Sequence, residues 1–323
     1  MIQKVGKKGF ILGVLFLLIC INSIPSTVGG GRNIGIIPKI NSYNNEETEY
    51  WGLIFAVGIY RQEIYQDVDR PYMIKDAYLL KETLLNSPNW KESNIHVVTA
   101  EEATGTRLIK ELLWLIRNED KNDFSFIYLT THGSPLLGPN DKPIDLPPKD
   151  EDDGADEILI MYDGFVKKYA FIWDDLLNFF LSLLQSKGVC LVVDSCYSGG
   201  FTDDPMFNGT YFQEYTPASF AKGLMEDLSG QNRVVLTSCR EDEPCYGNYF
   251  STFLIDGIGG AGDFCGNNDG INSAEESFEY AKYWVNLTRE YSPLFMPTIY
   301  DLYPGEYPLT FSSSIGDNSG GTL

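Results

Sequence analysis

The sequence predicts an α/β fold in which helices cover both faces of a mostly parallel sheet. Several short segments are apolar almost without interruption, which is typical of strands buried on both faces. Segments with helical spacing alternate with them along the chain, as they do when helices join parallel strands. The chain has 323 residues and is 43% hydrophobic, which is enough apolar material to fill the core of such a domain.

The pattern of each segment predicts its element. Apolar runs predict strands at residues 53–59, 95–98, 124–130, 189–194 and 233–238. Apolar residues at helical spacing predict helices at residues 74–85, 108–116, 174–184 and 273–290. Asp174 is placed to cap the third helix, and Ser273 with Glu276 forms a capping-box pattern at the fourth. Ligands bind at the carboxyl ends of strands in such sheets, so residues that follow strands are the functional candidates.

The N-terminus is predicted to be a secretory signal. Three lysines precede an apolar run at residues 10–21, and small and polar residues follow it, which is the order of a signal peptide. An uncleaved N-terminal anchor is the alternative. We therefore expect a secreted or extracytoplasmic protein with no membrane span in the mature chain. The expected segments are a signal peptide and leader at 1–30, a linker at 31–50, the folded domain at 51–311 and a disordered tail at 312–323.

The net charge limits the partners. At a formal net charge of −21, the surface repels the phosphates of nucleic acid and of anionic membranes. We therefore expect no nucleic acid among the partners of this chain.

Two of the predicted strands lead into residues that carry chemistry. His132 and Gly133 follow the strand at 124–130, and Cys196 follows the strand that ends at Asp194. If the two strands are parallel neighbours, His132 and Cys196 lie at the same edge of the sheet. A histidine beside a thiol takes its proton and later returns it to the leaving amine. A backbone carbonyl would suffice to orient His132, and the backbone N–H groups of Gly133 and Cys196 are natural donors to an oxyanion. The alternative is a structural cysteine and a histidine satisfied by hydrogen bonds.

These motifs resemble a known superfamily. A hydrophobic strand ending in His-Gly, followed by a second ending in Asp-Ser-Cys-Tyr-Ser-Gly, is similar to the caspase-like superfamily, which includes caspases, metacaspases, legumains and gingipains. The resemblance extends from about residue 51 to residue 238. It implies a six-stranded, mostly parallel sheet flanked by helices, with His132 as general base and Cys196 as nucleophile. The implied reaction is hydrolysis of protein or peptide substrates through an acyl-enzyme, which needs no cofactor.

The branch of the superfamily stays open. Asp194 before Cys196, the Lys-Asp-Ala segment at 75–77 and the acidic segment at 151–157 resemble metacaspases. Tyr197 stands where metacaspases usually have histidine, and this residue, like the signal peptide, is more similar to legumains or gingipains.

Asp76 and Asp194 are candidates for substrate binding. A buried pair of carboxylates stays ionised when it has a cationic partner, and an arginine or lysine side chain of the substrate would supply one. We therefore expect cleavage after basic residues. The alternative is that Asp194 caps a turn and Asp76 lies on a solvated helix face.

Two segments are candidates for calcium, which takes several oxygen ligands. The resemblance to metacaspases implies a site near the cleft formed by Asp156, Asp174, Asp175 and Asp203. A helix cap and a solvated loop are the alternative there. Separately, residues 265–276 resemble an EF-hand or dockerin-type loop, with ligand positions at Asn267, Asp269 and Glu276. A tight polar turn followed by a capped helix is the alternative for that loop.

Three functions are compatible with the motifs. The first is an active cysteine endopeptidase. The second is a catalytically silent caspase-fold module that binds protein partners, although the presence of both His132 and Cys196 argues against silence. The third is a transpeptidase or ligase, because an amine can attack the same acyl-enzyme.

Overall fold

The computed structural model describes the central part of the chain. It covers residues 47–62, 68–138, 142–149, 151, 154–167, 169–197, 224–225, 227–238, 249–288 and 297–312. The expected signal peptide, nearly all of the linker and nearly all of the tail therefore lie outside the described residues. None of the helices in the described part is long and apolar enough to cross a bilayer.

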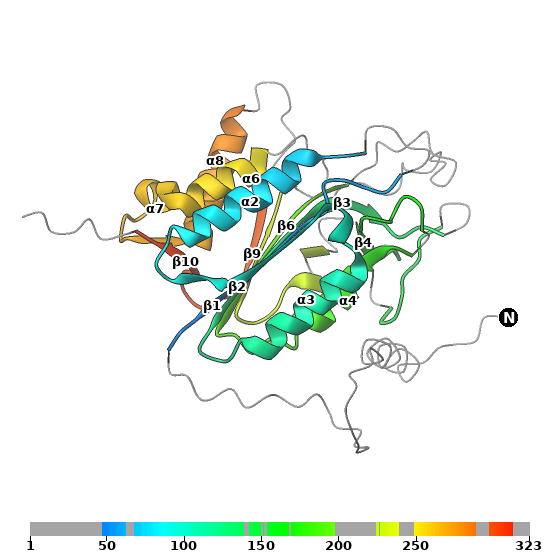
Figure 1. The fold of residues 1–323 in the computed structure, drawn as a ribbon, viewed down its shortest axis with the longest axis horizontal. Helices are drawn as coiled ribbons and strands as arrows, with labels where there is room; N and C mark the ends of the chain where they lie inside the picture. Colours follow the sequence, from blue (N-terminus) through cyan, green and yellow to red (C-terminus); the bar gives the residue numbers. More distant parts are fainter. Residues whose placement is uncertain are drawn as a thin grey trace, which may run out of the picture.

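A mostly parallel sheet runs through the centre of the domain (Figure 1). Its main strands are β1 (Tyr50–Ala56), β2 (Trp90–Thr99), β3 (Phe124–Pro135), β6 (Gly188–Tyr197), β7 (Arg233–Thr237) and β9 (Thr298–Asp301). They lie in the order β2-β1-β3-β6-β7-β9, and only the last pairing, between β7 and β9, is antiparallel. The expected mostly parallel, six-stranded arrangement is confirmed in this path.

Two short strands extend the sheet beside the end of β3. They are β4 (Glu157–Ile160), antiparallel to β3, and β5 (Phe171–Trp173), antiparallel to β4. The described sheet therefore has eight strands. A separate pair, β8 (Ile271–Ser273) and β10 (Pro308–Phe311), is antiparallel.

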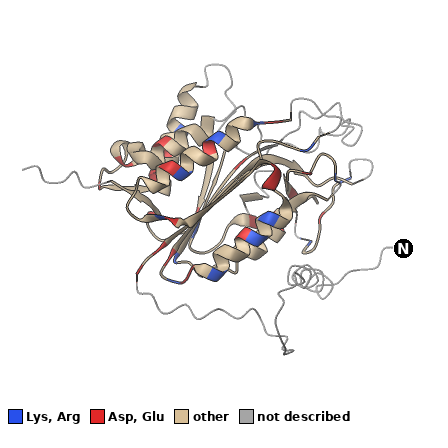
Figure 2. Cartoon of the chain, in the orientation of Figure 1, with Lys and Arg blue, Asp and Glu red and all other residues tan. Residues whose placement is uncertain are grey.

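Helices cover both faces of the sheet, as the sequence predicted (Figure 1). One face carries α2 (Pro71–Leu85), α6 (Tyr249–Asp256) and α8 (Ala274–Thr288), and the other carries α3 (Gly105–Asn118) and α4 (Asp174–Leu181). Shorter helical segments include η1 (Ala100–Glu102), η3 (Gly257–Ala261) and α7 (Gly262–Cys265). Lys, Arg, Asp and Glu residues lie mainly on helices and connecting loops (Figure 2).

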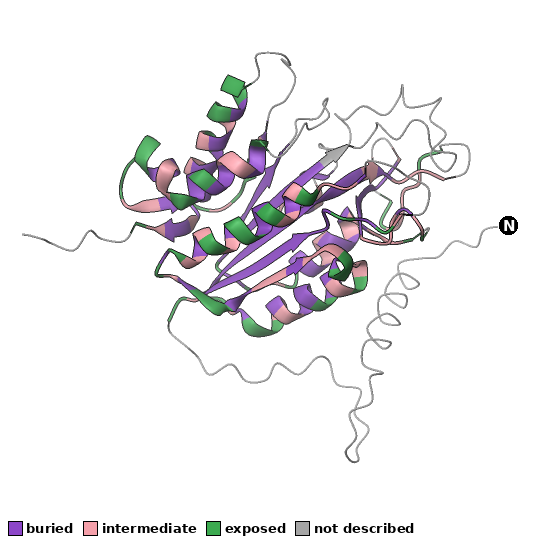
Figure 3. Cartoon of the chain, turned by 45° about the horizontal axis from the view of Figure 1, so that its top comes forward, coloured by how far each residue is buried: buried purple, intermediate pink, exposed green. Residues whose placement is uncertain are grey.

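Alternation along the strands fills two separate cores. In β3, Ile127 and Leu129 pack in the cluster with α3 and α4, whereas Phe126 and Tyr128 pack toward α2, α6 and α8. Successive side chains of a strand point to opposite faces, and here both faces are covered, so β3 is buried almost throughout and the central strands are mostly buried (Figure 3). This explains why the sequence shows continuous apolar runs there.

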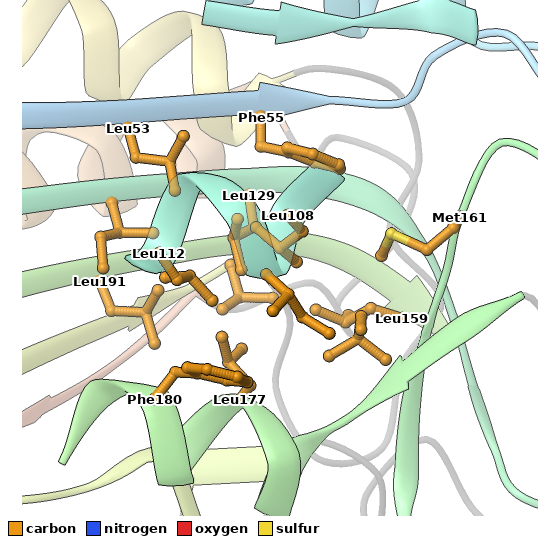
Figure 4. Close-up of a cluster of buried hydrophobic side chains, with 14 of the residues drawn as sticks. Leu53, Phe55, Leu108, Leu112, Leu129, Leu159, Met161, Leu177, Phe180 and Leu191 are labelled. Carbon is orange, nitrogen blue, oxygen red and sulfur yellow. The ribbon is translucent and has the colours of Figure 1, made fainter. Parts of the chain in front are cut away.

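The first of these cores is built around α3 (Figure 4). Leu108 and Leu112 of this helix lie against Leu53 and Phe55 of β1, and residues of α4 close the cluster from below in this view. The side chain of Thr104 caps α3, because its hydroxyl accepts a hydrogen bond from the Arg107 backbone N–H at 3.3 Å. Capping and the apolar stripe together determine where this helix begins and which face it buries.

Candidate active site

The catalytic candidates lie at the carboxyl ends of two adjacent parallel strands. β3 continues beyond the predicted strand end through His132 and Gly133, and β6 continues through Cys196. The register pairs His132 with Cys196 and, two residues earlier, Thr130 with Asp194. The backbone therefore brings the two motifs of the sequence side by side at one edge of the sheet, where ligands of parallel sheets bind.

His132 is buried, and several groups fix its orientation. Its ring nitrogen Nε2 lies 2.8 Å from the backbone carbonyl oxygen of Val68. The ring stacks on Tyr60 with centroids 4.9 Å apart and meets the edge of Phe165 at 6.1 Å. The Tyr60 hydroxyl accepts a hydrogen bond from the His132 backbone N–H at 2.8 Å and lies 2.9 Å from the hydroxyl of Thr131. Because a carbonyl only accepts hydrogen bonds, Nε2 carries the proton and Nδ1 carries the lone pair of the neutral ring.

The surroundings keep this imidazole neutral. Burial lowers the pKa of His132 to about 4, although the hydrogen bond to Val68 acts in the opposite direction, and the positive charge of Arg70 adds to the lowering. At neutral pH the ring is therefore a base with its lone pair on Nδ1, which is the protonation state that a proton acceptor needs.

The oxyanion donors proposed from the sequence lie within the sheet. Gly133 pairs with Tyr197 of β6 on one side and with Leu159 of β4 on the other. The Cys196 amide belongs to the end of β6. Both groups are thus at the same strand ends as His132, and their role as donors stays a prediction.

Asp76 and Asp194 are both buried and lie on the same side of the sheet. Asp76 is on α2 and Asp194 on β6, and their exposed fractions are 4% and 7%. Tyr128 of β3 is buried as well. Its pKa is raised well above the ordinary value, first by burial, and also by the negative charges of Asp194 and Asp76. Because Asp76 is buried, it does not lie on a solvated helix face.

Three aspartates expected to bind calcium also come together. Asp156, Asp174 and Asp175 each offer a carboxylate oxygen, and these oxygens lie within 4.8 Å of one another. Asp156 and Asp174 are 0% and 1% exposed. Burial, with Asp174 as a further cause, raises the pKa of Asp156 to about 7, and burial raises the pKa of Asp174 to about 6. The fourth candidate, Asp203, lies outside the described residues.

The structure adds acidic residues that the sequence did not single out. Glu151, Glu157 and Asp227 lie within the same distance of Asp174. Glu151 and Glu157 belong to the acidic segment noted in the sequence, whereas Asp227 is distant along the chain and carries no motif. Asp174 is also not the helix cap that its position suggested. The cap is Trp173, and the Asp174 carboxylate accepts hydrogen bonds from the backbone N–H groups of Glu157 at 3.0 Å and Asp175 at 2.9 Å.

The second calcium candidate, the loop at 265–276, uses its polar side chains internally. Asn267 Oδ1 accepts from the Asp269 N–H, and the Asp269 carboxylate accepts from the Ile271 N–H, both at 2.9 Å. Glu276 closes the predicted capping box, because its N–H donates to the Ser273 hydroxyl at 3.1 Å and its carboxylate accepts from the Ser273 N–H at 3.3 Å. These contacts are those of a tight turn and a capped helix, and a calcium loop at this place stays a prediction.

The segment that contains the two strand-end motifs is similar to a known peptidase family. The sequence model described as metacaspase, peptidase C14 domain, matches residues 65–205, a segment that contains both His132 and Cys196. Over this segment the chain is similar to the metacaspases, which are cysteine peptidases of the caspase-like superfamily. Among curated members, metacaspase-1 of Candida albicans is 31% identical over 109 residues, which cover 33% of this chain and 23% of that protein. The chain thus spans about a quarter of the length of that relative.

Two solved structures align with most of this chain. A protein of Geobacter sulfurreducens has a TM-score of 0.50 at 14% identity, and the match covers 82% of this chain and 100% of that one. Caspase-1 from Spodoptera frugiperda has a TM-score of 0.49 at 11% identity and covers 83% and 92%. At 14% identity, the similarity to the Geobacter sulfurreducens protein shows the fold alone.

Proposed function

We propose that this chain is a cysteine endopeptidase in which Cys196 is the nucleophile and His132 the general base. The observation that carries the proposal is the register of β3 and β6, which sets His132 opposite Cys196. The hydrogen bond to Val68 supports it further, because it holds the imidazole as the tautomer whose Nδ1 accepts a proton.

The reaction follows from these roles. His132 takes the thiol proton as the Cys196 sulfur attacks the carbonyl carbon of the scissile bond, and N–H groups of Gly133 and Cys196 stabilise the oxyanion. The C–N bond then breaks, and His132 returns the proton to the leaving amine. A water molecule attacks the remaining thioester, with His132 again as the base, and releases the carboxylic acid and the thiol. No third side chain is required, because the Val68 carbonyl orients the ring.

A peptide assay with matched cysteine variants tests this proposal. Fluorogenic peptides with arginine before the scissile bond are offered to the wild type, to Cys196→Ala and to Cys265→Ala. Cys265 is a free and exposed cysteine, so its replacement controls for the loss of a thiol. We expect hydrolysis by the wild type and by Cys265→Ala, and at least a thousandfold loss in Cys196→Ala. Unchanged hydrolysis by Cys196→Ala would show that another group is the nucleophile.

We propose further that the enzyme cleaves after arginine or lysine. The burial of Asp76 and Asp194 on one side of the sheet supports this, because two desolvated carboxylates are stabilised by a cationic substrate side chain. A peptide library with all residues at the position before the scissile bond measures the preference. Cleavage after asparagine in place of arginine and lysine would refute it.

Calcium is the third part of the proposal, and the described aspartates fit such an ion. Oδ1 of Asp156 is buried and has no hydrogen-bond partner among the described residues, while carboxylate oxygens of Asp174 and Asp175 lie within 4.8 Å. Hard carboxylate oxygens are the ligands that calcium prefers. When bound, the ion would neutralise crowded negative charge.

The place of these aspartates suggests how calcium acts on the peptidase. Asp156 directly precedes β4, and its backbone carbonyl accepts from the Leu136 N–H at 2.7 Å, just after the end of β3. An ion at Asp156 therefore stabilises the segment that follows His132 and Gly133. We expect chelator to abolish activity and calcium, but not magnesium, to restore it. Asp174→Asn should lose this response, whereas Glu101→Gln, an exposed acidic control, should keep it.

We also propose that the chain is exported, on the basis of the N-terminal pattern. N-terminal sequencing of the protein recovered from its native host tests this. A mature N-terminus within residues 22–50 supports export, and an intact Met1 on intracellular protein contradicts it.

A further inference from the structure

A chain of buried hydroxyl groups ends on Asp194. The Tyr128 hydroxyl lies 2.6 Å from the hydroxyl of Ser251, and Ser251 in turn donates a hydrogen bond to the Asp194 carboxylate. Tyr128 and Ser251 are both 0% exposed. They come from β3 and α6, so three separate elements meet at this carboxylate.

The direction of the hydrogen bonds follows from the chemistry of the groups. Burial and nearby negative charge raise the pKa of Tyr128 well above its ordinary value, so its hydroxyl keeps the proton. The Ser251 hydroxyl donates its one proton to the Asp194 carboxylate. In the hydrogen bond with Tyr128, Ser251 is therefore the acceptor. Both O–H bonds therefore point toward Asp194, and each hydrogen bond polarises the next.

Burial of Asp194 favours its protonated form, and these donors oppose that effect. Burial raises the pKa of its carboxyl group, and hydrogen bonds from Ser251 and Ser238 lower it. A carboxylate that loses a donor in such a place is more readily protonated and less firmly oriented. No cation is among the groups that affect the pKa of Asp194 in the described part of the chain.

We propose that Ser251 and Tyr128 are positioning residues for substrate specificity: they hold Asp194 as an oriented anion that selects a basic side chain before the scissile bond. This inference rests on the proposed cleavage after arginine or lysine. It assigns a role in specificity to α6, an element that follows both catalytic motifs along the chain.

A pair of substrates isolates the role of charge from that of stability. One fluorogenic peptide carries arginine before the scissile bond, and the other carries citrulline, its neutral isostere. The measured quantity is the ratio of kcat/KM for the two peptides. Loss of folding lowers both values together, whereas loss of the oriented anion lowers only the value for arginine.

Four variants complete the design. Ser251→Ala and Tyr128→Phe remove the two hydroxyls of the chain. Ser125→Ala and Tyr307→Phe are the matched controls for the serine and the tyrosine variant. Ser125 is buried on β3, the strand of Tyr128, and its hydroxyl forms a hydrogen bond with that of Ser186. The hydroxyl of Tyr307 donates to the backbone carbonyl of Ser125. If Ser251→Ala fails to fold, as judged by circular dichroism, Tyr128→Phe retains the test because it keeps the ring.

We expect Ser251→Ala to lower the arginine-to-citrulline ratio about tenfold or more, mainly through a higher KM for the arginine peptide. Tyr128→Phe should lower the ratio by a smaller factor, and both controls should keep the wild-type ratio. A wild-type preference for arginine that survives both substitutions in folded protein would overturn this inference alone. A wild type that does not prefer arginine would refute the proposed specificity and the inference with it.

Discussion

Replacement of His132 by glutamine should change how the stability of the protein depends on pH. The ordinary pKa of histidine is about 6.5, whereas burial lowers the pKa of His132 in the folded chain to about 4. Between these two values the unfolded state binds one proton that the folded state does not. The free energy of unfolding therefore rises with pH across this window and is lost as pH falls toward 4.

The size of the effect follows from the shift. One pKa unit corresponds to about 1.4 kcal/mol, so the full window is worth about 3 kcal/mol. Between pH 7 and pH 5 the part due to His132 is about 2 kcal/mol. The side chain is buried, with His132 only 3% exposed, so solvent screening reduces this figure little. Buried carboxylates such as Asp156 give a slope of opposite sign, but that slope is common to the wild type and the variant.

Urea unfolding at pH 7 and pH 5 measures the difference. We expect the wild type to lose about 2 kcal/mol more than His132→Gln does between the two pH values. Parallel pH curves for the wild type and His132→Gln would refute a buried neutral imidazole and, with it, the general-base role in this form.

Three further substitutions have expected effects. Tyr60→Phe removes the hydroxyl that accepts a hydrogen bond from the His132 backbone N–H. It should lower the free energy of unfolding, measured by urea titration, by about 1–3 kcal/mol, and it should also lower kcat. Unchanged values of both quantities would contradict the assigned contact. Ser273→Ala removes the cap of α8 and should cost about 1 kcal/mol by the same method, with catalysis unaffected. Leu112→Ala empties part of the core below the sheet and should cost about 2–5 kcal/mol, and a much smaller loss would mean that the site collapses around the missing atoms.

The sequence was most informative where strands are buried on both faces. The central strands β3 and β6 show continuous apolar runs, and their location was predicted to within a few residues. The edge strand β2 begins at Trp90, five residues before the predicted start, because exposed polar residues interrupt its pattern. The short strands β4 and β5 were not predicted at all. Each has at most four residues, too few for a periodic signal.

The sequence motifs predicted the two catalytic candidates, but not the residues that position them. The strands that carry His132 and Cys196 are parallel neighbours in the sheet, and their register sets the two residues opposite each other. The carbonyl that orients His132 belongs to Val68, 64 residues away, and a backbone group leaves no mark in a side-chain pattern. Ser251, 57 residues from Asp194, carries no motif either. Such partners are determined by the packing of helices on the sheet, which only the fold reveals.

Covalent trapping shows whether Cys196 is the nucleophile and His132 the base that activates it. The protein is treated with a peptidyl chloromethyl ketone that carries arginine next to the reactive carbon, and the labelled residue is located by mass spectrometry of its fragments. We expect rapid labelling of Cys196 in the wild type, at least a hundredfold slower labelling in His132→Ala, and little label on the exposed Cys265. Equal labelling of Cys196 and Cys265, or labelling of Cys196 at the same rate without His132, would contradict this assignment.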